Sequence, residues 1–127
     1  MTVIPQNINS QTISIQDFAK IEIRVGKVTQ AENVNDSTKL IRLHVDLGDF
    51  GTRIIFTGVR SYGYYPADFI GKQFLFVTNL ESKKIMTEES QGMILAVDGL
   101  ELPFEQHGSV KPLFIEVNHL PLGSKIR

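Results

Sequence analysis

The chain has 127 residues, contains no cysteine, and carries 13 Lys and Arg against 14 Asp and Glu, which gives a net charge of -1. This length suits one domain with a single core, and the lack of cysteine excludes disulfides, thiolate catalysis and thiolate metal sites, as suits the cytoplasm. Because the charge is nearly balanced and no segment approaches the roughly 20 apolar residues of a membrane helix, we expect a soluble protein with no membrane partner, in which any polyanion site is a local patch.

The N-terminal segment is polar and shows no sustained period. Residues 1–13 are rich in Asn, Gln and Thr, so we expect an N-terminal arm, followed by one folded domain over residues 14–127. Ser14 is placed to cap a short helix, and Asp17 falls in its first turn, where a carboxylate is favoured.

The first strand is predicted over residues 21–28. Its apolar residues keep one parity up to Val25, but after Gly26 the next apolar residue, Val28, has the opposite parity. A glycine at such a change indicates a bulge or a sharp bend, which small closed barrels use to turn a long strand. We therefore expect a bent first strand.

A hairpin is predicted over residues 39–59. Apolar and polar residues alternate from residue 40 to 48, the sequence "GDFG" is typical of a turn, and a second strand follows. Pro66 at a first helical position and Gly71 just after the end then predict a short helix.

The remaining strands are apolar on both faces. Residues 72–80, 93–97 and 113–117 show this pattern, so the barrel interior must cover one face and the short helix or another subunit the other. Residues 100–112 indicate a loop or hairpin insertion before the last strand. Six short strands without a repeat period predict an all-β barrel.

Several segments resemble the tRNA-binding domain family in order and spacing: "DFAKIEIRVGKV", "GKQFLFVTNLESKKI", "ESQGMILAVDG" and "PLGSKIR", over about residues 17–127. This family includes the C-terminal domain of some methionyl-tRNA synthetases, free-standing structure-specific tRNA-binding proteins and the endothelial monocyte-activating polypeptide domain. The resemblance implies a five-stranded oligonucleotide-binding (OB) barrel with short helices and a C-terminal extension. Free-standing members often form homodimers, so a homodimer is expected.

The resemblance also implies a non-catalytic, dimeric protein that recognises the folded shape of tRNA, with an aminoacyl-tRNA synthetase as a further candidate partner. The positions that match the family's motifs give an RNA-binding site of six residues: Lys39, Asn79, Lys83, Lys84, Ser90 and Met93. Lysines would supply mobile positive charges, and Asn and Ser would donate hydrogen bonds to phosphate or ribose. Recognition would follow RNA shape more than base sequence.

Five of these six residues also have a structural interpretation, and Lys83 and Lys84 could belong to an ordinary solvated turn. Asn79 and Ser90 could satisfy backbone groups at strand ends, and Met93 could pack in the core. The three tyrosines within residues 62–65 could stack on bases, but packing over a barrel end or a dimer interface is the favoured interpretation.

No catalytic constellation is evident in the sequence. The three histidines, at positions 44, 107 and 119, lack metal-ligand spacing, and Ser90 lies outside any Gly-x-Ser-x-Gly motif. There is also no Gly-rich phosphate loop that leads into a helix. We therefore expect no enzyme activity, no metal and no cofactor.

Two other functions stay open. Where the family usually shows His-Pro-x-Ala-Asp-Lys-Leu, the chain has "VNDSTKL", and Glu81, Glu88 and Glu89 lie beside the lysines, where they would repel phosphate. This charge pattern suits a CsaA-type secretion chaperone or peptide-binding module, which resembles the same family. A third hypothesis is a docking or oligomerisation domain with residues 6–16 as an arm across its partner.

Overall fold

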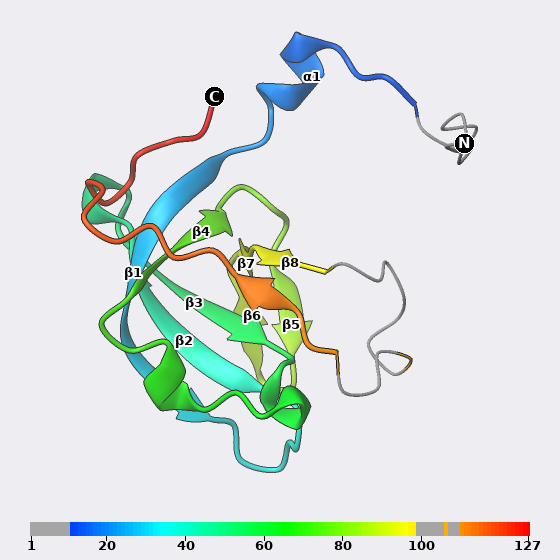
Figure 1. Cartoon of the computed structure of the whole chain (residues 1–127), viewed down its shortest axis with the longest axis vertical. Coiled ribbons are helices and arrows are strands. Elements are labelled where there is room, and N and C mark those ends of the chain that lie inside the picture. Colours follow the sequence, from blue (N-terminus) through cyan, green and yellow to red (C-terminus); the bar gives the residue numbers. More distant parts are fainter. Residues whose placement is uncertain (1–10, 99–105, 107–109) are drawn as a thin grey trace, which may run out of the picture.

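A five-stranded antiparallel sheet forms a nearly closed barrel in the computed structural model, which describes residues 11–98, 106 and 110–127 (Figure 1). The strand order is β3-β2-β1-β4-β7. Its strands are β1 (Ile23–Asn33), β2 (Ile41–Asp46), β3 (Thr52–Thr57), β4 (Gln73–Val77) and β7 (Met93–Ile94). The prediction of an all-β, five-stranded OB-like barrel is confirmed.

Smaller elements surround the barrel. Two two-stranded sheets pair β5 (Lys83–Ile85) with β6 (Glu88–Ser90) and β8 (Ala96–Val97) with β9 (Leu113–Phe114). Among the described residues, the helices are one short α-helix, α1 (Ile15–Phe18), and three 3-10 turns: η1 (Gly48–Phe50), η2 (Arg60–Tyr62) and η3 (Pro66–Asp68). The last begins with the proline that predicted a short helix there. In the described part of the chain, no helix has the length and apolar character needed to cross a membrane.

Strand β1 is long and belongs to two pairings: its first half pairs with β4 and its second half with β2. The register shifts between Val28 and Gln30, where one extra residue forms a bulge. Of the bulge and the sharp bend that the sequence indicated at Gly26, the bulge is not found there, because Gly26 stays in register with Phe74. Gly26 instead makes room for the core, since a Cβ there would lie 2.6 Å from Val45 Cγ1.

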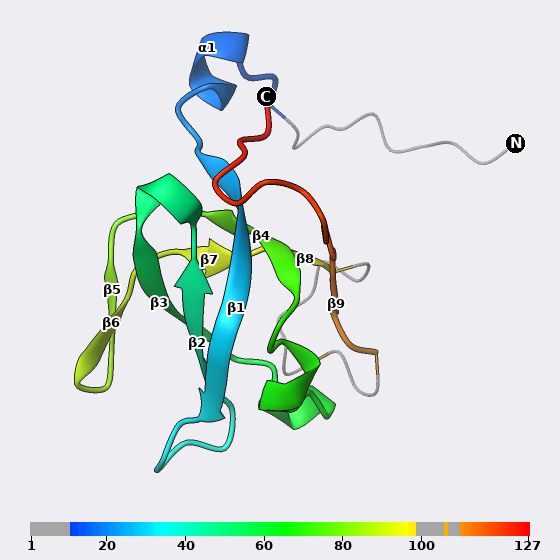
Figure 2. The ribbon, with the colours of Figure 1, turned by 90° about the vertical axis from the view of Figure 1, so that its left-hand side faces the viewer.

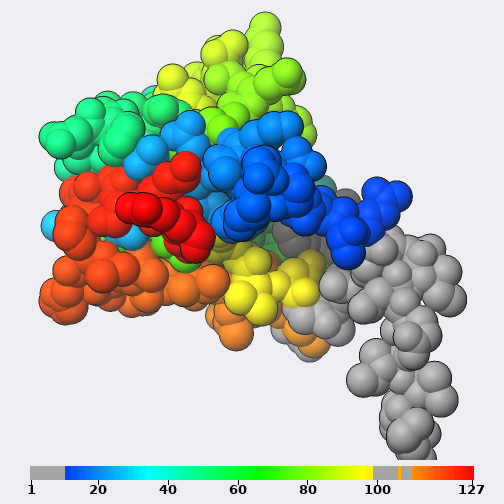
Figure 3. Space-filling model, turned by 90° about the horizontal axis from the view of Figure 1, so that it is seen from above, coloured from blue at the N-terminus to red at the C-terminus, as the bar shows by residue number. Residues whose placement is uncertain are grey.

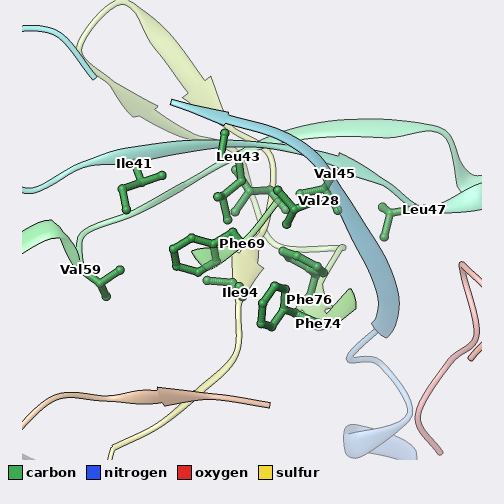
Figure 4. Packing of buried hydrophobic residues seen from close by; sticks show 12 residues of the cluster. Val28, Ile41, Leu43, Val45, Leu47, Val59, Phe69, Phe74, Phe76 and Ile94 are labelled. Carbon is green, nitrogen blue, oxygen red and sulfur yellow. The ribbon is translucent and has the colours of Figure 1, made fainter. Parts of the chain in front are cut away.

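The core fills the barrel with residues from every strand of the large sheet (Figure 4). Strand β2 shows the expected alternation: Ile41, Leu43 and Val45 are buried, while the residues between them are half-buried on the other face. The core cluster contains Val28, Ala31, Ile41, Leu43, Val45, Leu47, Ile55, Val59, Phe69, Phe74, Phe76 and Ile94. The predicted hairpin of residues 39–59 is confirmed by the antiparallel pairing of β2 with β3.

Aromatic rings close one end of the barrel. Phe69, just after η3, packs 5.7 Å from Phe74 and 5.8 Å from Tyr64, measured between ring centroids. The Tyr64 hydroxyl donates to the Pro112 carbonyl at 2.6 Å, and burial, followed by the charge of a nearby aspartate, raises the pKa of this phenol. Tyr62 also packs against the core, so the packing interpretation of these two tyrosines is confirmed.

The C-terminal residues lie along β1, close to α1. Ser14 caps α1, as predicted, by accepting a hydrogen bond at 3.0 Å from the Asp17 amide. Three backbone hydrogen bonds join β1 to residues 123–126, which brings the C-terminus beside α1 (Figures 1 and 2). Residues 1–10 of the expected arm, and the expected insertion at 100–112 except residues 106 and 110–112, lie outside the described residues.

Candidate functional site

The β5–β6 hairpin stands beside β3 at one side of the barrel (Figure 2). The Ser90 hydroxyl accepts a hydrogen bond from the Phe56 amide at 3.1 Å and donates to the Gly92 carbonyl at 3.2 Å. The Gln91 amide donates to the Ile54 carbonyl at 2.8 Å. These contacts anchor the end of β6 to β3, so the position of the hairpin is set by the barrel.

The two predicted lysines of the hairpin point to opposite sides of it. Lys83 pairs with Ser90 across the hairpin, and Lys84 pairs with Glu89. Because successive side chains of a strand alternate between faces, Lys83 shares the face of the buried Ser90, whereas Lys84 shares the outer face with the exposed Glu89. The pair "KK" is therefore not one continuous basic patch.

A groove of about 450 Å³ lies between the hairpin and the start of β7, and we call it the Met93 groove. Met93 and Leu80 are 46% and 49% exposed, so their apolar surfaces are open to a ligand and Met93 is not a core residue. The groove is lined by Leu80, Glu81, Lys83, Ile85, Ser90, Gly92 and Met93. Three of the six predicted site residues, Lys83, Ser90 and Met93, thus come together here.

The other three predicted residues lie outside this groove. Asn79 follows β4, where its amide nitrogen donates to the Lys20 carbonyl at 2.6 Å and its amide oxygen accepts from the Glu22 backbone at 2.9 Å. Both polar groups of Asn79 therefore tie β4 to the chain that enters β1. Lys39 is exposed in the loop between β1 and β2, and Lys84 lies on the outer face of the hairpin.

Gly92 permits a close approach of backbone to backbone. Its φ is +149°, a conformation that L-residues with a side chain rarely adopt, and a Cβ would lie 2.7 Å from the Val77 carbonyl oxygen. The glycine of the "SQGM" motif thus allows the chain to cross β4 at this point and present Met93 to the groove.

A second groove, of about 400 Å³, lies beside the tip of the hairpin, and we call it the Arg42 groove; Ile85 lines both grooves. It runs between the loop after β1, the polar face of β2 and β3, and the tip of the hairpin. Its charged residues are Glu32, Asp36, Arg42 and Glu88, so carboxylates outnumber the single guanidinium. The motif resemblance did not point to this groove, although the alternation in β2 had placed Arg42 on the solvated face.

Arg42 binds a carboxylate on each side. Its Nε and Nη2 donate to Glu88 Oε2 at 3.0 and 2.8 Å, and its Nη1 donates to Glu32 Oε2 at 3.0 Å. His44 Nε2 lies 2.9 Å from the same Glu32 oxygen. The groove thus contains a connected ionic network that joins β1, β2 and β6.

The network shifts the pKa values of two of its members. The hydrogen bond from Arg42 to Glu88, and then the one to Glu32, raise the pKa of Arg42 above its ordinary value, against the effect of burial. Burial alone would raise the pKa of Glu32, but hydrogen bonds from Arg42 and His44 together outweigh it, so the pKa of this carboxyl is lowered. Glu32 therefore stays ionised and holds Arg42 in place.

The chemistry of the two grooves is that of binding. The Met93 groove offers an apolar floor and a lysine at its rim, and the Arg42 groove offers a guanidinium held among carboxylates. Among the residues that the structure describes, no three His, Asp or Glu side chains lie together as a metal site would require.

The sequence matches a known family over most of its length. Residues 23–124 match the family described as "Putative tRNA binding domain". The methionine–tRNA ligase of Thiobacillus denitrificans is 38% identical over 106 residues, which make up 84% of this chain and 15% of the ligase. The chain therefore spans only a small part of the length of this relative.

Solved structures show the same fold. A MetRS-related protein from Pyrococcus horikoshii has a TM-score of 0.81 and 32% identity, and the match covers 93% of this chain and 100% of that one. The chaperone CsaA from Bacillus anthracis has a TM-score of 0.77 and 27% identity, and the match covers 92% and 100% of the two chains.

Proposed function

The chain belongs to the tRNA-binding domain family, as the motifs predicted, and we propose that it is a non-catalytic cytoplasmic protein that binds tRNA by its folded shape. The observation that carries this proposal is the Met93 groove, where a lysine stands at the rim of an exposed apolar surface. A lysine can contact a phosphate while a base or ribose packs on the apolar floor. Contacts of this kind read RNA shape more than sequence.

Each predicted residue has a role in this proposal. Lys83 contacts phosphate at the groove, and Met93 packs against a base or ribose. Lys84 and Lys39, which are exposed outside the groove, contact more distant phosphates of a large ligand. Asn79 and Ser90 act by position, since their hydrogen bonds hold the end of β4 and the hairpin in place.

Binding of tRNA is tested by titrating total tRNA, and an unstructured RNA of the same length, at several salt concentrations. We expect a preference for tRNA, with log affinity falling linearly with log salt. Lys83→Glu should weaken binding and reduce the salt slope by about 0.7–0.9 for each phosphate that the variant no longer neutralises. Lys27→Glu on β1 is the charge-matched control, because Lys27 is exposed and lines neither groove. Equal effects of the two variants would contradict the site.

The proposed active form is a homodimer, joined through an apolar surface that we call the terminal patch, formed by Ile15, Phe18, Ala19, Ile21 and Ile126. Figure 3 shows that α1 and the C-terminal residues, in blue and red, lie side by side there. Ile15, Ile21 and Ile126 are 71%, 39% and 37% exposed there, around a groove of about 170 Å³. A patch that pairs with its own copy about a two-fold axis would cover these side chains and present two hairpins to one tRNA.

The dimer is tested by measuring molar mass in solution by sedimentation. We expect the wild-type chain to be dimeric and Ile15→Asp to be monomeric. Ile70→Asp is the control, because Ile70 is 45% exposed but lies outside the terminal patch, so this variant should remain a dimer. A monomeric wild-type chain would contradict the interface.

The similarity to methionine–tRNA ligases and to CsaA supports two finer possibilities. An aminoacyl-tRNA synthetase is a candidate partner, because in the ligase relative the matching region is part of a synthetase. A peptide-binding or chaperone function is the second candidate, since the Met93 groove could take an apolar side chain and Glu81 lies at its rim. Binding of an unfolded polypeptide that resists added salt, without tRNA binding, would favour the second.

A further inference from the structure

We propose that Arg42 is a phosphate-binding residue on the barrel face and that Glu88 controls its availability by occupying the edge of the guanidinium that a phosphate would take. This inference rests on the proposed RNA-binding function and adds a residue and a control that the family motifs do not include. It requires that Arg42 face an RNA-accessible groove, that Glu88 hold its donor edge, and that Glu88 be displaceable.

The position of Arg42 meets the first requirement. In OB barrels, the face of the second and third strands and the flanking loops bind oligonucleotides. The Arg42 groove lies on this face, between the loop after β1 and the β5–β6 hairpin. Phe56, the cross-strand partner of Arg42 on β3, lines the same groove. An aromatic ring beside a guanidinium is suited to a base and its phosphate.

The hydrogen bonds of Arg42 meet the second requirement. The Nε and Nη2 groups form the edge with which arginine binds phosphate or carboxylate through two parallel donors. Both groups donate to the same oxygen of Glu88, at 3.0 and 2.8 Å. Glu88 therefore takes the place that a phosphate oxygen would occupy in a complex with RNA.

The two carboxylates on Arg42 differ in how firmly they are held. Glu32 also accepts a hydrogen bond at 3.1 Å from Gln30 and contacts His44, so it is fixed from three directions and orients the guanidinium. Glu88 has 45% of its side chain exposed, and Arg42 is the partner with which it forms an ion pair. Because this ion pair is to Arg42, a phosphate that binds the same two donors replaces Glu88.

The charge of the groove explains why the control has a large effect. Three carboxylates, those of Glu32, Asp36 and Glu88, line the groove with one guanidinium, so the closed groove repels phosphate. Loss of Glu88 removes one negative charge and frees two donors at the same time. Glu88 thus lowers the affinity of the Arg42 groove for phosphate, so that only a ligand with other contacts on the hairpin, such as those at Lys83, binds there.

The experiment compares Glu88→Ala with Glu89→Ala in the same tRNA titrations over a range of salt. Both variants remove one negative charge from β6, but Glu89 lies on the outer face and does not line the Arg42 groove. We expect Glu88→Ala to raise the affinity about 3- to 10-fold and to steepen the salt slope by about 0.7–0.9, as the neutralisation of one more phosphate requires. Glu89→Ala should leave the slope unchanged. Equal effects would overturn the proposal.

A double-mutant cycle with Arg42→Gln distinguishes the masking of Arg42 by Glu88 from a simple loosening of the hairpin. If Glu88 masks Arg42, then Arg42→Gln lowers the affinity several-fold more in the Glu88→Ala background than in the wild-type background. If loosening were the cause, Arg42→Gln alone would raise the affinity as Glu88→Ala does, because both break the same ion pair, and this result would overturn the proposal. Melting temperatures confirm that each variant is folded.

Failure of this inference differs from failure of the proposed function. If the wild-type chain binds tRNA but the glutamate variants behave alike, RNA binding stands and the role of Glu88 is wrong. If the wild-type chain and all variants bind no tRNA at low salt, the proposed function is wrong and the role of Glu88 falls with it.

Discussion

Replacement of Gly92 by alanine tests whether this glycine serves the fold or a ligand. In the structure Gly92 has a φ of +149°, and a Cβ would meet the Val77 carbonyl oxygen at 2.7 Å and Ile55 Cδ1 at 3.1 Å. The carbonyl belongs to the backbone of β4, so it cannot rotate away as a side chain would. We therefore expect Gly92→Ala to destabilise the fold itself, whether or not RNA is present.

The expected loss has two parts. A residue with a side chain held in this backbone region costs about 1–3 kcal/mol. Forcing a methyl group against packed neighbours costs about another 1–3 kcal/mol. The total is about 2–6 kcal/mol. For 127 residues, an unfolding entropy of about 2.1 cal/mol/K per residue makes each kcal/mol worth roughly 4 °C, so the melting temperature should fall by about 8–24 °C.

The assay is thermal unfolding followed by circular dichroism, with Gly58→Ala as the matched control. Nothing lies within 4 Å of a Cβ at Gly58, so this alanine should be neutral or slightly stabilising, by up to about 1 kcal/mol. A melting temperature of Gly92→Ala within about 4 °C of the wild type would refute the reasoning. If such a stable variant had lost tRNA binding, the glycine would serve ligand approach instead.

Three further predictions follow from single positions. Gly26→Ala should cost about 1–3 kcal/mol of unfolding free energy by denaturant titration, because its Cβ would lie 2.6 Å from Val45 Cγ1, and an unchanged midpoint would contradict this. Asn79→Ala should lower the melting temperature without changing the salt slope of tRNA binding, because it removes the hydrogen-bond partner of the Glu22 backbone amide and of the Lys20 carbonyl. A changed slope would instead show that Asn79 contacts RNA. Because the folded-state pKa of Glu32 is lowered, the stability that its carboxylate contributes is present above the ordinary pKa of 4.5 and is lost as pH falls through the lower folded value. The melting temperatures of wild type and Glu32→Gln should therefore converge as pH falls below 4.5, and a constant difference would contradict this.

The barrel could be predicted from the sequence because its strands carry strong local patterns. Alternation predicted the hairpin of β2 and β3, and Pro66 predicted a short helix between strands, which the structure has as the 3-10 turn η3. The bend of β1 was also predicted, but the position of its bulge was not. The change of hydrophobic parity shows that a different face of the strand turns toward the core. The position of the extra residue, however, is set by the pairing with β2, which the sequence of β1 alone does not show.

The hairpin β5–β6 was not predicted as a pair of strands. Each strand has three residues, and the turn between them is formed by Met86 and Thr87, with Met86 at a φ of +57°. Tight hairpin turns with positive φ are usually marked by Asn-Gly or Asp-Gly, so this turn had no sequence signal. The hairpin exists because Ser90 and Gln91 bond to β3, which is a tertiary cause.

The missing sequence signal for this hairpin also explains why only part of the candidate site could be predicted. Motif resemblance named residues along the chain, but the faces of an unpredicted hairpin decide which of them meet. Lys83 reaches the Met93 groove with Ser90, whereas Lys84 faces away beside Glu89. Arg42 and Glu88 are 46 positions apart in sequence, so their ion pair could not be seen without the fold.

The distribution of charge on the hairpin limits how the protein can bind RNA. Lysines and glutamates lie opposite each other on the hairpin, as Lys84 and Glu89 do, and such cross-strand neighbours are closer than the roughly 8 Å over which charges act at physiological salt. Their fields therefore largely cancel at a distance, and with a net charge of -1 the chain cannot attract RNA by long-range steering. Binding must depend on short contacts within the grooves, with Lys83 lining the Met93 groove and Glu88 lining the Arg42 groove. A protein of this kind should associate with tRNA at a rate that depends weakly on salt and should lose it at a rate that depends strongly on salt, because the charges act only once the grooves are in contact.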